Sequence, residues 1–271
     1  MFYKTIASVF YSFYTFFLYG ESSLSLDFDF KGKKILLTGV TGDVGSVLAS
    51  SFLKSGAKLF GVGRSPDKIN KMENVNGIAR YVAVDFNEED QVKDIVQQGL
   101  TWLGGCDIFI HTAAYMQVND PLSISESDWA YALNINLLAP YFFIQKAFPF
   151  LCKSVSGRII LFGSGAGKHG GIGTNLTYGA CKGGILAMTF NLAREFAKTK
   201  VTVNCLVPGP IDGHMMNQFD AGTLKTSLGK HPMGRFAMPK EIVSATLFLA
   251  SEETAHINGE AFDVNGGYYT D

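Results

Sequence analysis

Tyr178 and Lys182 stand four positions apart in the segment Tyr178-Gly-Ala-Cys-Lys182, so in a helix they share one face, one turn apart. Ser164 ends an apolar, strand-like run upstream. A nearby cation lowers the pKa of a phenol from its usual value of about 10, and such a phenol can give a proton to an alkoxide or take it back. A serine hydroxyl can hydrogen-bond the same oxygen. These side chains predict acid–base chemistry on a carbonyl or an alcohol, although Tyr-x-x-x-Lys alone also arises on ordinary amphipathic helices.

The turn before the first predicted helix indicates a dinucleotide-binding site. It reads Thr38-Gly-Val-Thr-Gly-Asp-Val-Gly45, between a strand-like run at residues 33–38 and a helix-like run at residues 46–55. Glycines let the backbone approach a pyrophosphate closely, and the helix N-terminus offers unpaired N–H groups. Asp43 is unfavourable in this turn, because its carboxylate would repel a pyrophosphate unless it points away and caps the helix.

Arg64 follows directly after the second predicted strand, residues 58–63. Sites that select the unphosphorylated cofactor usually place an acid at this strand end, where it binds the ribose hydroxyls. A guanidinium can instead pair with a 2′-phosphate. The sequence therefore predicts NADP(H) in preference to NAD(H), with Asp67 as the weaker, competing acid.

The ends of the later strands supply the rest of the predicted site. Asp85 and Phe86 are expected to border the adenine, and the small residues 112–114 let the backbone pass close to the ribose or nicotinamide. His111, just before them, is interpreted as a packed side chain, and the turn at residues 208–210 completes the set. The expected cofactor contacts are Thr38, Gly39, Thr41, Gly42, Asp43, Val44, Gly45, Arg64, Asp85, Phe86, Thr112, Ala113, Ala114, Tyr178, Lys182, Pro208, Gly209 and Ile211.

Alternation of apolar runs with helix-like segments predicts an α/β fold, with a single doubly wound parallel sheet of the Rossmann type and helices on both faces. The expected strands are residues 33–38, 58–63, 78–84, 106–111, 157–163, 200–207 and 260–264, and the expected helices are residues 46–55, 88–103, 125–153, 174–198 and 239–251. Ligands bind beyond the carboxyl ends of such strands, so the residues that follow them should meet at one edge.

Two segments have less regular features. Residues 211–238 lack periodicity and hold four methionines, which predicts a lid or binding loop for an apolar substrate. The predicted helix at residues 125–153 contains Asn134 and Asn136 in its interior, where asparagine is mildly disfavoured. One of the two is expected to support a bound water, and Asn134 is interpreted as a surface amide.

Composition and cysteine spacing exclude some classes of function and indicate the cellular compartment of the protein. A net charge of −1 without a basic run argues against nucleic-acid binding, and the four cysteines lack metal-ligand spacing, so no metal is expected. Mostly apolar or small neighbours favour reduced thiols, and hence the cytoplasm.

Residues 1–26 form an aromatic leader before a catalytic domain at residues 27–271. The leader is open to three interpretations: a secretory signal, a membrane- or partner-contacting segment, or a poorly ordered leader.

Residues 27–268 resemble the short-chain dehydrogenase/reductase family, and most closely its 3-oxoacyl-acyl-carrier-protein reductase type. The resemblance is carried by Lys31-Gly-Lys33, Val203-Asn-Cys-Leu-Val-Pro-Gly209, Gly234-Arg-Phe-Ala-Met-Pro-Lys-Glu241, Leu247-Phe-Leu-Ala-Ser251 and Val264-Asn-Gly-Gly267. It implies an enzyme that interconverts a carbonyl and a secondary alcohol with NADP(H), and that forms a homodimer or homotetramer.

The resemblance also implies roles for matching residues. Tyr178 would be the general acid/base, Ser164 would orient the substrate carbonyl, and Lys182 would hold the nicotinamide ribose and lower the pKa of Tyr178. Asn136 would support a proton-relay water. The three glycines Gly39, Gly42 and Gly45 would line the pyrophosphate, and Arg64 would select NADP.

Three departures from the family pattern leave other functions open. Asp43 aligns with a glycine, His111-Thr-Ala-Ala114 replaces Asn-Asn-Ala-Gly, and Gly213 matches a threonine that contacts the nicotinamide amide. They favour an alternative in which the protein is a non-catalytic NADP(H)-binding sensor or scaffold. The leader and the methionines suggest a third function, an enzyme that acts on a lipid-like ketone at a membrane.

Overall fold

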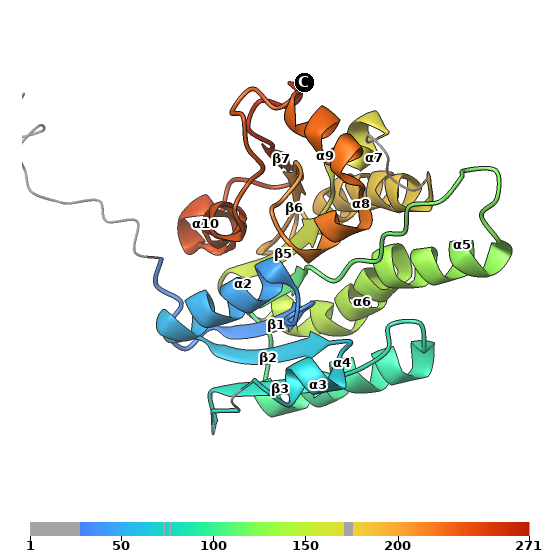
Figure 1. Cartoon of the computed structure of the whole chain (residues 1–271). Coiled ribbons are helices and arrows are strands. Elements are labelled where there is room, and N and C mark those ends of the chain that lie inside the picture. Colours follow the sequence, from blue (N-terminus) through green and yellow to red (C-terminus); the bar gives the residue numbers. More distant parts are fainter. Residues whose placement is uncertain (1–27, 73, 76, 171–175, 271) are drawn as a thin grey trace, which may run out of the picture.

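A single parallel sheet organises the chain, which a computed structural model describes at residues 28–72, 74–75, 77–170 and 176–270 (Figure 1). The sheet has seven strands in the order β3-β2-β1-β4-β5-β6-β7. The strands are β1 (Lys34–Thr38), β2 (Lys58–Gly63), β3 (Ala79–Ala83), β4 (Ile108–His111), β5 (Gly157–Phe162), β6 (Val201–Pro208) and β7 (Ala261–Val264). The order reverses between β1 and β4, which is where such sheets open a crevice for a ligand. The predicted doubly wound parallel sheet is confirmed.

The apolar side chains of the central strands alternate between the two faces of the sheet. Leu36 of β1 is in register with Phe60 of β2 and Phe109 of β4, and all three belong to one buried cluster. Ile35 and Leu37 point the other way, into a second buried cluster. Because helices cover both faces, these strands read as continuous apolar runs in the sequence.

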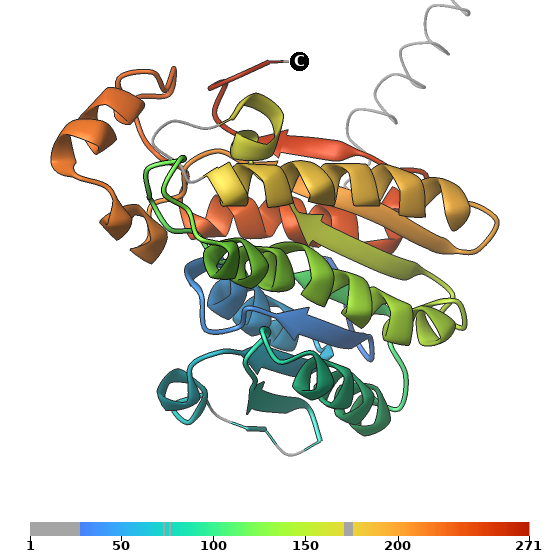
Figure 2. The ribbon, with the colours of Figure 1, turned by 90° about the vertical axis from the view of Figure 1, so that its right-hand side faces the viewer.

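Helices form one layer on each face of the sheet. The layers consist of α4 (Glu89–Leu103), α6 (Ala139–Leu151) and α8 (Leu176–Glu195) on the face of the first cluster, and of α2 (Asp43–Lys54) and α10 (Pro239–Ala250) on the other. Figure 2 shows the three helices of the first layer side by side in front of the strands. The predicted start of the α8 helix at residue 174 lies outside the described residues.

The predicted helix at residues 125–153 is interrupted. It consists of α5 (Glu126–Leu133), a π-helical turn η1 (Asn134–Leu138) and then α6. The side-chain amide of Asn136 donates to the carbonyl of Ala132, and Pro140 has no N–H to donate to the carbonyl of Asn136. Both effects disturb the regular hydrogen-bond ladder, which explains the wide turn at this point.

Residues 211–238 contain more secondary structure than the sequence predicted. A 3₁₀ turn η2 (His214–Gln218) precedes the helix α9 (Ala221–Leu228), which lies above the carboxyl edge of the sheet in Figure 1. Asp220 caps α9 by accepting a hydrogen bond from the Thr223 N–H at 2.9 Å. Two further short helices, α3 (Pro66–Ile69) and α7 (Gly165–His169), were also not predicted.

Within the described residues, the helices are too short or too polar to cross a membrane. Residues 1–26, to which the membrane and targeting interpretations apply, lie outside the part of the chain that the structure describes.

Candidate active site

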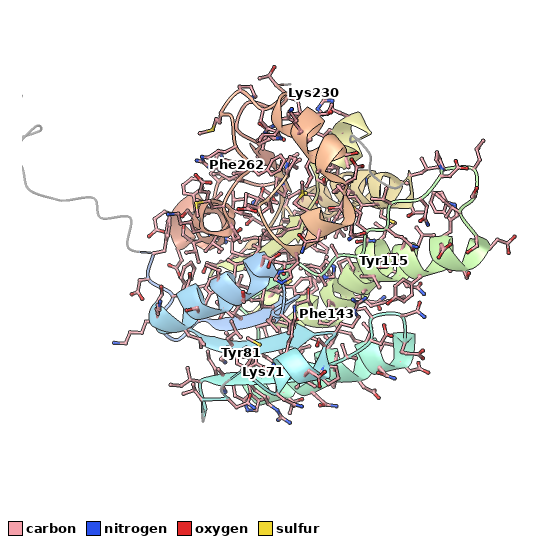
Figure 3. All side chains as sticks on the ribbon, viewed as in Figure 1. Lys71, Tyr81, Tyr115, Phe143, Lys230 and Phe262 are labelled. Atoms are coloured by element: carbon pink, nitrogen blue, oxygen red, sulfur yellow. The ribbon has the colours of Figure 1, made fainter. Side chains whose placement is uncertain are left out.

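A cavity of about 1290 Å³ lies at the carboxyl edge of the sheet, where the predicted residues were expected to meet. Ser164 lines it, together with these predicted cofactor contacts: Gly39, Thr41, Gly42, Asp43, Val44, Gly45, Arg64, Phe86, Thr112, Ala113, Ala114, Tyr178, Lys182, Pro208, Gly209 and Ile211. Tyr115 and Lys230, both labelled in Figure 3, line it from the loop after β4 and from the segment after α9. A volume of this size is large for a single small-molecule site, and it leaves room for a dinucleotide beside a substrate.

Three predicted residues do not line the cavity. Thr38 is buried and its hydroxyl is 2.8 Å from Nδ1 of His111. The carboxylate of Asp85 accepts the N–H of Asn87 at 3.0 Å. Asn136 is buried beneath the loop after β4, and it is therefore one layer away from the cavity surface.

Tyr178, Lys182 and Ser164 are brought together as the sequence predicted. Tyr178 and Lys182 lie one turn apart on α8, and Nζ of Lys182 is 5.5 Å from the centroid of the Tyr178 ring. The hydroxyl of Ser164 hydrogen-bonds the side chain of Tyr178 and also caps α7, by accepting the Ala166 N–H at 3.2 Å. Its position is thus held from two sides.

Burial, and not the lysine, has the larger effect on the phenol. Burial raises the pKa of Tyr178, and the hydrogen bond from Ser164 opposes that rise. The sequence-based expectation that Lys182 lowers this pKa is therefore not met. The ammonium of Lys182 donates to the carbonyl of Phe162 at 2.6 Å, and burial lowers the pKa of Lys182 to about 8.

His111 is a packed side chain, in agreement with its interpretation from the sequence. It is fully enclosed, and burial, followed by the charge of Lys182, lowers its pKa to about 3. A neutral imidazole that is bonded to Thr38 and does not line the cavity cannot act as an acid or a base on a substrate there.

The side chains of both asparagines are hydrogen-bonded to other parts of the protein. All three hydrogen bonds of the Asn136 side chain go to the backbone: it accepts the Tyr115 N–H at 3.0 Å and donates to the carbonyls of Tyr115 and Ala132, both at 2.9 Å. It thus ties the loop after β4 to the π-helical turn. Asn134 is not a free surface amide, because it donates to the side chain of Asn87 at 2.8 Å.

The glycine turn has the shape that a pyrophosphate requires. Gly39 has a φ of +77°, and a Cβ there would come within 2.5 Å of the backbone nitrogen of Ala113. Gly42 is the N-cap of α2 and contributes no side-chain hydrogen bond to the first turn. The N–H groups at the start of α2 consequently face the cavity without a side-chain cap, which favours an anion.

Asp43 does not cap α2, although it is the first residue of that helix. Its carboxylate accepts two hydrogen bonds from His214, one from the backbone N–H at 2.7 Å and one from Nδ1 at 2.6 Å. The carboxylate therefore points toward the 211–238 segment and away from the turn that would hold a pyrophosphate.

Arg64 is exposed at the other end of the cavity, where its guanidinium donates to the hydroxyl of Tyr131 at 3.3 Å. Ser65 and Lys68 line the cavity beside it, and the competing acid Asp67 does not. Lys68 was not predicted to lie at the site, and the short helix α3 places it in the cavity wall. Only its spacing of four residues from Arg64 could have indicated this position.

Other cavity residues were missed because they come from distant parts of the chain. Met116 belongs to a small apolar cluster with Tyr178, and Met215 and Phe219 pack against this cluster. Tyr268 and Tyr269 line the cavity from the C-terminal segment. The methionine-rich composition of residues 211–238 hinted at Met215. Nothing in the local sequence signalled the two tyrosines.

The sheet order, the uncapped helix start at the glycine turn and the group formed by Tyr178, Lys182 and Ser164 are typical of a class of protein, the α/β proteins with a dinucleotide crevice at the carboxyl edge of a parallel sheet. A family model described as enoyl-(acyl carrier protein) reductase matches residues 39–269. The chain belongs to the short-chain dehydrogenase/reductase family, as the sequence predicted, and is an oxidoreductase of the carbonyl/alcohol type.

Curated relatives and solved structures agree with this assignment. A 3-oxoacyl-acyl-carrier-protein reductase of Vibrio harveyi is 32% identical over 244 residues, which is 88% of this chain and 98% of the relative. One from Vibrio cholerae is 31% identical, with the same coverage of 88% and 98%. A crystal structure from Brucella melitensis, titled short-chain dehydrogenase/reductase SDR:glucose/ribitol dehydrogenase, has a TM-score of 0.84 at 28% identity and covers 90% of this chain and 99% of its own.

Proposed function

We propose that the protein is an NADP(H)-dependent reductase or dehydrogenase that interconverts a carbonyl and a secondary alcohol, with Tyr178 as its general acid/base. The observation that carries this proposal is the hydrogen bond between Ser164 and the buried phenol of Tyr178 in the cavity wall, one helical turn from Lys182. A phenol in such a position can exchange a proton with a substrate oxygen, and a serine hydroxyl can bind that same oxygen.

The residues present fit a nicotinamide dinucleotide. When bound, such a cofactor supplies the hydride, and the protein supplies position and electrostatics. The start of α2 would hold the pyrophosphate, and Lys182 would hold the ribose next to the nicotinamide. In reduction, Tyr178 gives its proton to the oxygen of the substrate while Ser164 donates a hydrogen bond to it; in oxidation, the proton returns to Tyr178. Asn136 acts indirectly, by holding the loop at Tyr115.

The preference for NADP(H) is supported by the charges near the expected ribose. Arg64 and Lys68 both line the cavity, and their cationic groups can pair with a 2′-phosphate. Asp67, which would favour the unphosphorylated cofactor, does not line it. A titration with NADPH and NADH, followed by nicotinamide fluorescence, tests this preference. Tighter NADPH binding supports it, and tighter NADH binding contradicts it while leaving the acid–base roles intact.

The substrate class is proposed from the walls of the cavity and from the relatives. Met116, Met215 and Phe219 make the region around Tyr178 apolar, which suits a substrate with an apolar chain. Because two relatives are named 3-oxoacyl-acyl-carrier-protein reductases, 3-oxoacyl thioesters are the first compounds to assay with NADPH. Turnover of a thioester, followed at the absorbance of NADPH, supports the proposal.

A non-catalytic NADP(H)-binding sensor is the second candidate, and Gly213 favours it, because this glycine lines the cavity at the position that matches the family's threonine to the nicotinamide amide. The two candidates differ in one measurement. Tight NADPH binding without turnover of any member of a panel of ketones, aldehydes, 3-oxoacyl thioesters and secondary alcohols favours the sensor.

We also propose that the protein forms a homodimer or homotetramer and is located in the cytoplasm. Leu138, Tyr141 and Phe190, at or on α6 and α8, are large apolar side chains that are about 40% exposed, and a second copy would cover them. The four cysteines are unpaired, which fits a reducing compartment. Light scattering of the purified protein measures the number of copies.

A further inference from the structure

Asp43 and His214 connect two segments that are 171 residues apart in the chain. Both carboxylate oxygens are engaged: Oδ2 accepts the backbone N–H of His214 at 2.7 Å, and Oδ1 is 2.6 Å from its Nδ1. The carboxylate is 28% exposed, whereas the imidazole is 77% exposed. The backbone hydrogen bond holds the start of the 3₁₀ turn η2 directly.

Gly213 provides an independent sign that the two segments are fitted to each other. A Cβ at Gly213 would overlap Oδ2 of Asp43 and would lie 2.8 Å from its Cγ. The backbone of Gly213 is extended, with φ 175° and ψ −176°, so its conformation does not require a glycine. A glycine is needed here because the Asp43 carboxylate occupies the space that a side chain would take. Asp43 and Gly213, two of the departures from the family pattern, are therefore in direct contact.

The turn that Asp43 holds supplies part of the wall around the proposed acid/base. Met215 and Phe219 lie one and five residues after His214, and both pack in the small cluster that contains Tyr178. The turn has its own backbone hydrogen bonds, from the Met216 N–H to Gly213 at 3.0 Å and from the Phe219 N–H to Met216 at 3.1 Å. Its attachment to α2, in contrast, goes through the Asp43 carboxylate.

We propose that Asp43 is a positioning residue, which holds the segment at residues 213–219 through His214 so that Met215 and Phe219 form the substrate wall beside Tyr178. Its role in substrate binding depends on the proposed function, whereas its role in holding the segment does not. With both oxygens bonded to His214, the carboxylate also stays turned away from the N–H groups of the glycine turn.

Hydrogen exchange of the free protein tests the link without any cofactor or substrate. Asp43→Ala removes the acceptor of the His214 N–H, so exchange at the amides of His214, Met216 and Phe219 should become about tenfold faster. His214→Ala keeps the backbone hydrogen bond and should give a smaller increase. Asp120→Ala is the matched control, because Asp120 also accepts one backbone N–H and one side-chain donor, at Leu122 and Ser123 in another exposed loop; it should leave the three amides unchanged.

Gly213→Ala tests whether faster exchange reflects loss of the specific contact with Asp43 or a general loosening of the segment at residues 213–219. Its Cβ should force the Asp43 carboxylate away and bring exchange at His214 close to the Asp43→Ala level. In the Asp43→Ala background the same substitution meets no carboxylate, so it should add little. Unchanged exchange at these amides in Asp43→Ala would overturn the proposal, and so would a Gly213→Ala effect that is equally large in both backgrounds.

Steady-state kinetics at saturating NADPH then test the catalytic consequence. Asp43→Ala should raise the KM of an apolar carbonyl substrate about fivefold to tenfold and change kcat less, since the acid–base group remains. A fall in kcat at constant KM would overturn the positioning role in substrate binding. If the wild-type protein turns over no substrate, the proposed function fails, and the exchange measurements still judge the link between Asp43 and His214.

Discussion

The hydroxyl of Tyr269 occupies the space that any side chain at Gly165 would need, directly after Ser164. The ring of Tyr269 lies 4.3 Å from that of His169, centroid to centroid, and its backbone carbonyl accepts the side-chain amide of Asn265 at 2.9 Å. The C-terminal segment is thus packed against the turn that carries the proposed substrate-orienting serine.

Replacing Gly165 with alanine should consequently disturb the active site. The new methyl group and Tyr269 cannot both fit, so Ser164 or the C-terminal segment must move, and we expect kcat to fall at least tenfold. The double variant Gly165→Ala/Tyr269→Ala should recover part of the loss, because it removes the overlap. Gly229→Ala is the control, since a Cβ there makes only ordinary contacts, the nearest at 3.5 Å. Normal kinetics in Gly165→Ala would show that this packing does not position Ser164.

Tyr178→Phe removes the proposed acid/base and keeps the ring that packs against Met116 and Ala166. Turnover should fall by about 10²- to 10⁴-fold, the range that a positioned proton donor contributes, while NADPH binding changes little. Nicotinamide fluorescence and NADPH absorbance measure the two quantities. Near-normal turnover in this variant would refute the assignment.

Arg64→Ala should weaken NADPH binding about tenfold to a hundredfold, which corresponds to the loss of charge-assisted hydrogen bonds to a phosphate. NADH has no 2′-phosphate, so its dissociation constant should stay within about twofold. Arg80→Ala is a suitable control, because Arg80 is an exposed arginine of β3 that does not line the cavity. An equal loss of affinity for both cofactors would exclude Arg64 as the selector.

The buried ammonium of Lys182 should give stability a distinct dependence on pH. Its folded pKa is about 8, below its ordinary value of 10.5, so the unfolded chain binds the proton more tightly. Charging Lys182 therefore destabilises the fold below pH 8, by up to about 3 kcal/mol, and this cost fades as the pH rises from 8 toward 10.5.

Lys182→Met isolates this effect, because it fills the site without a charge. The free energy of unfolding of the wild type, relative to Lys182→Met, should rise between pH 8 and pH 10 in urea titrations at a series of pH values. A pH-independent difference between the two proteins would show that Lys182 has an ordinary pKa.

Much of the fold could be predicted from the sequence because the relevant signals are local. Apolar runs predicted each strand of the sheet, and the strand–glycine–helix pattern around Gly39 and Gly42 predicted the cofactor turn. The helical repeat placed Tyr178 and Lys182 on one face, and the strand ends brought them to one edge with Ser164. These features depend on side-chain periodicity and on turn chemistry within a few residues.

Other features could not be read from the sequence, because they depend on residues far apart in the chain. The hydrogen bonds that tie Asn136 to the loop after β4 involve Tyr115, 21 positions away, and the close approach of Tyr269 to Gly165 depends on where the C-terminal segment packs. The raised pKa of Tyr178 comes from burial by several elements, which a neighbouring lysine does not reveal. The sequence by itself determined the fold, the family and the candidate acid–base side chains. Only the tertiary structure decided that Asp43 turns toward His214, since a carboxylate takes its direction from the donors that the folded chain brings to it.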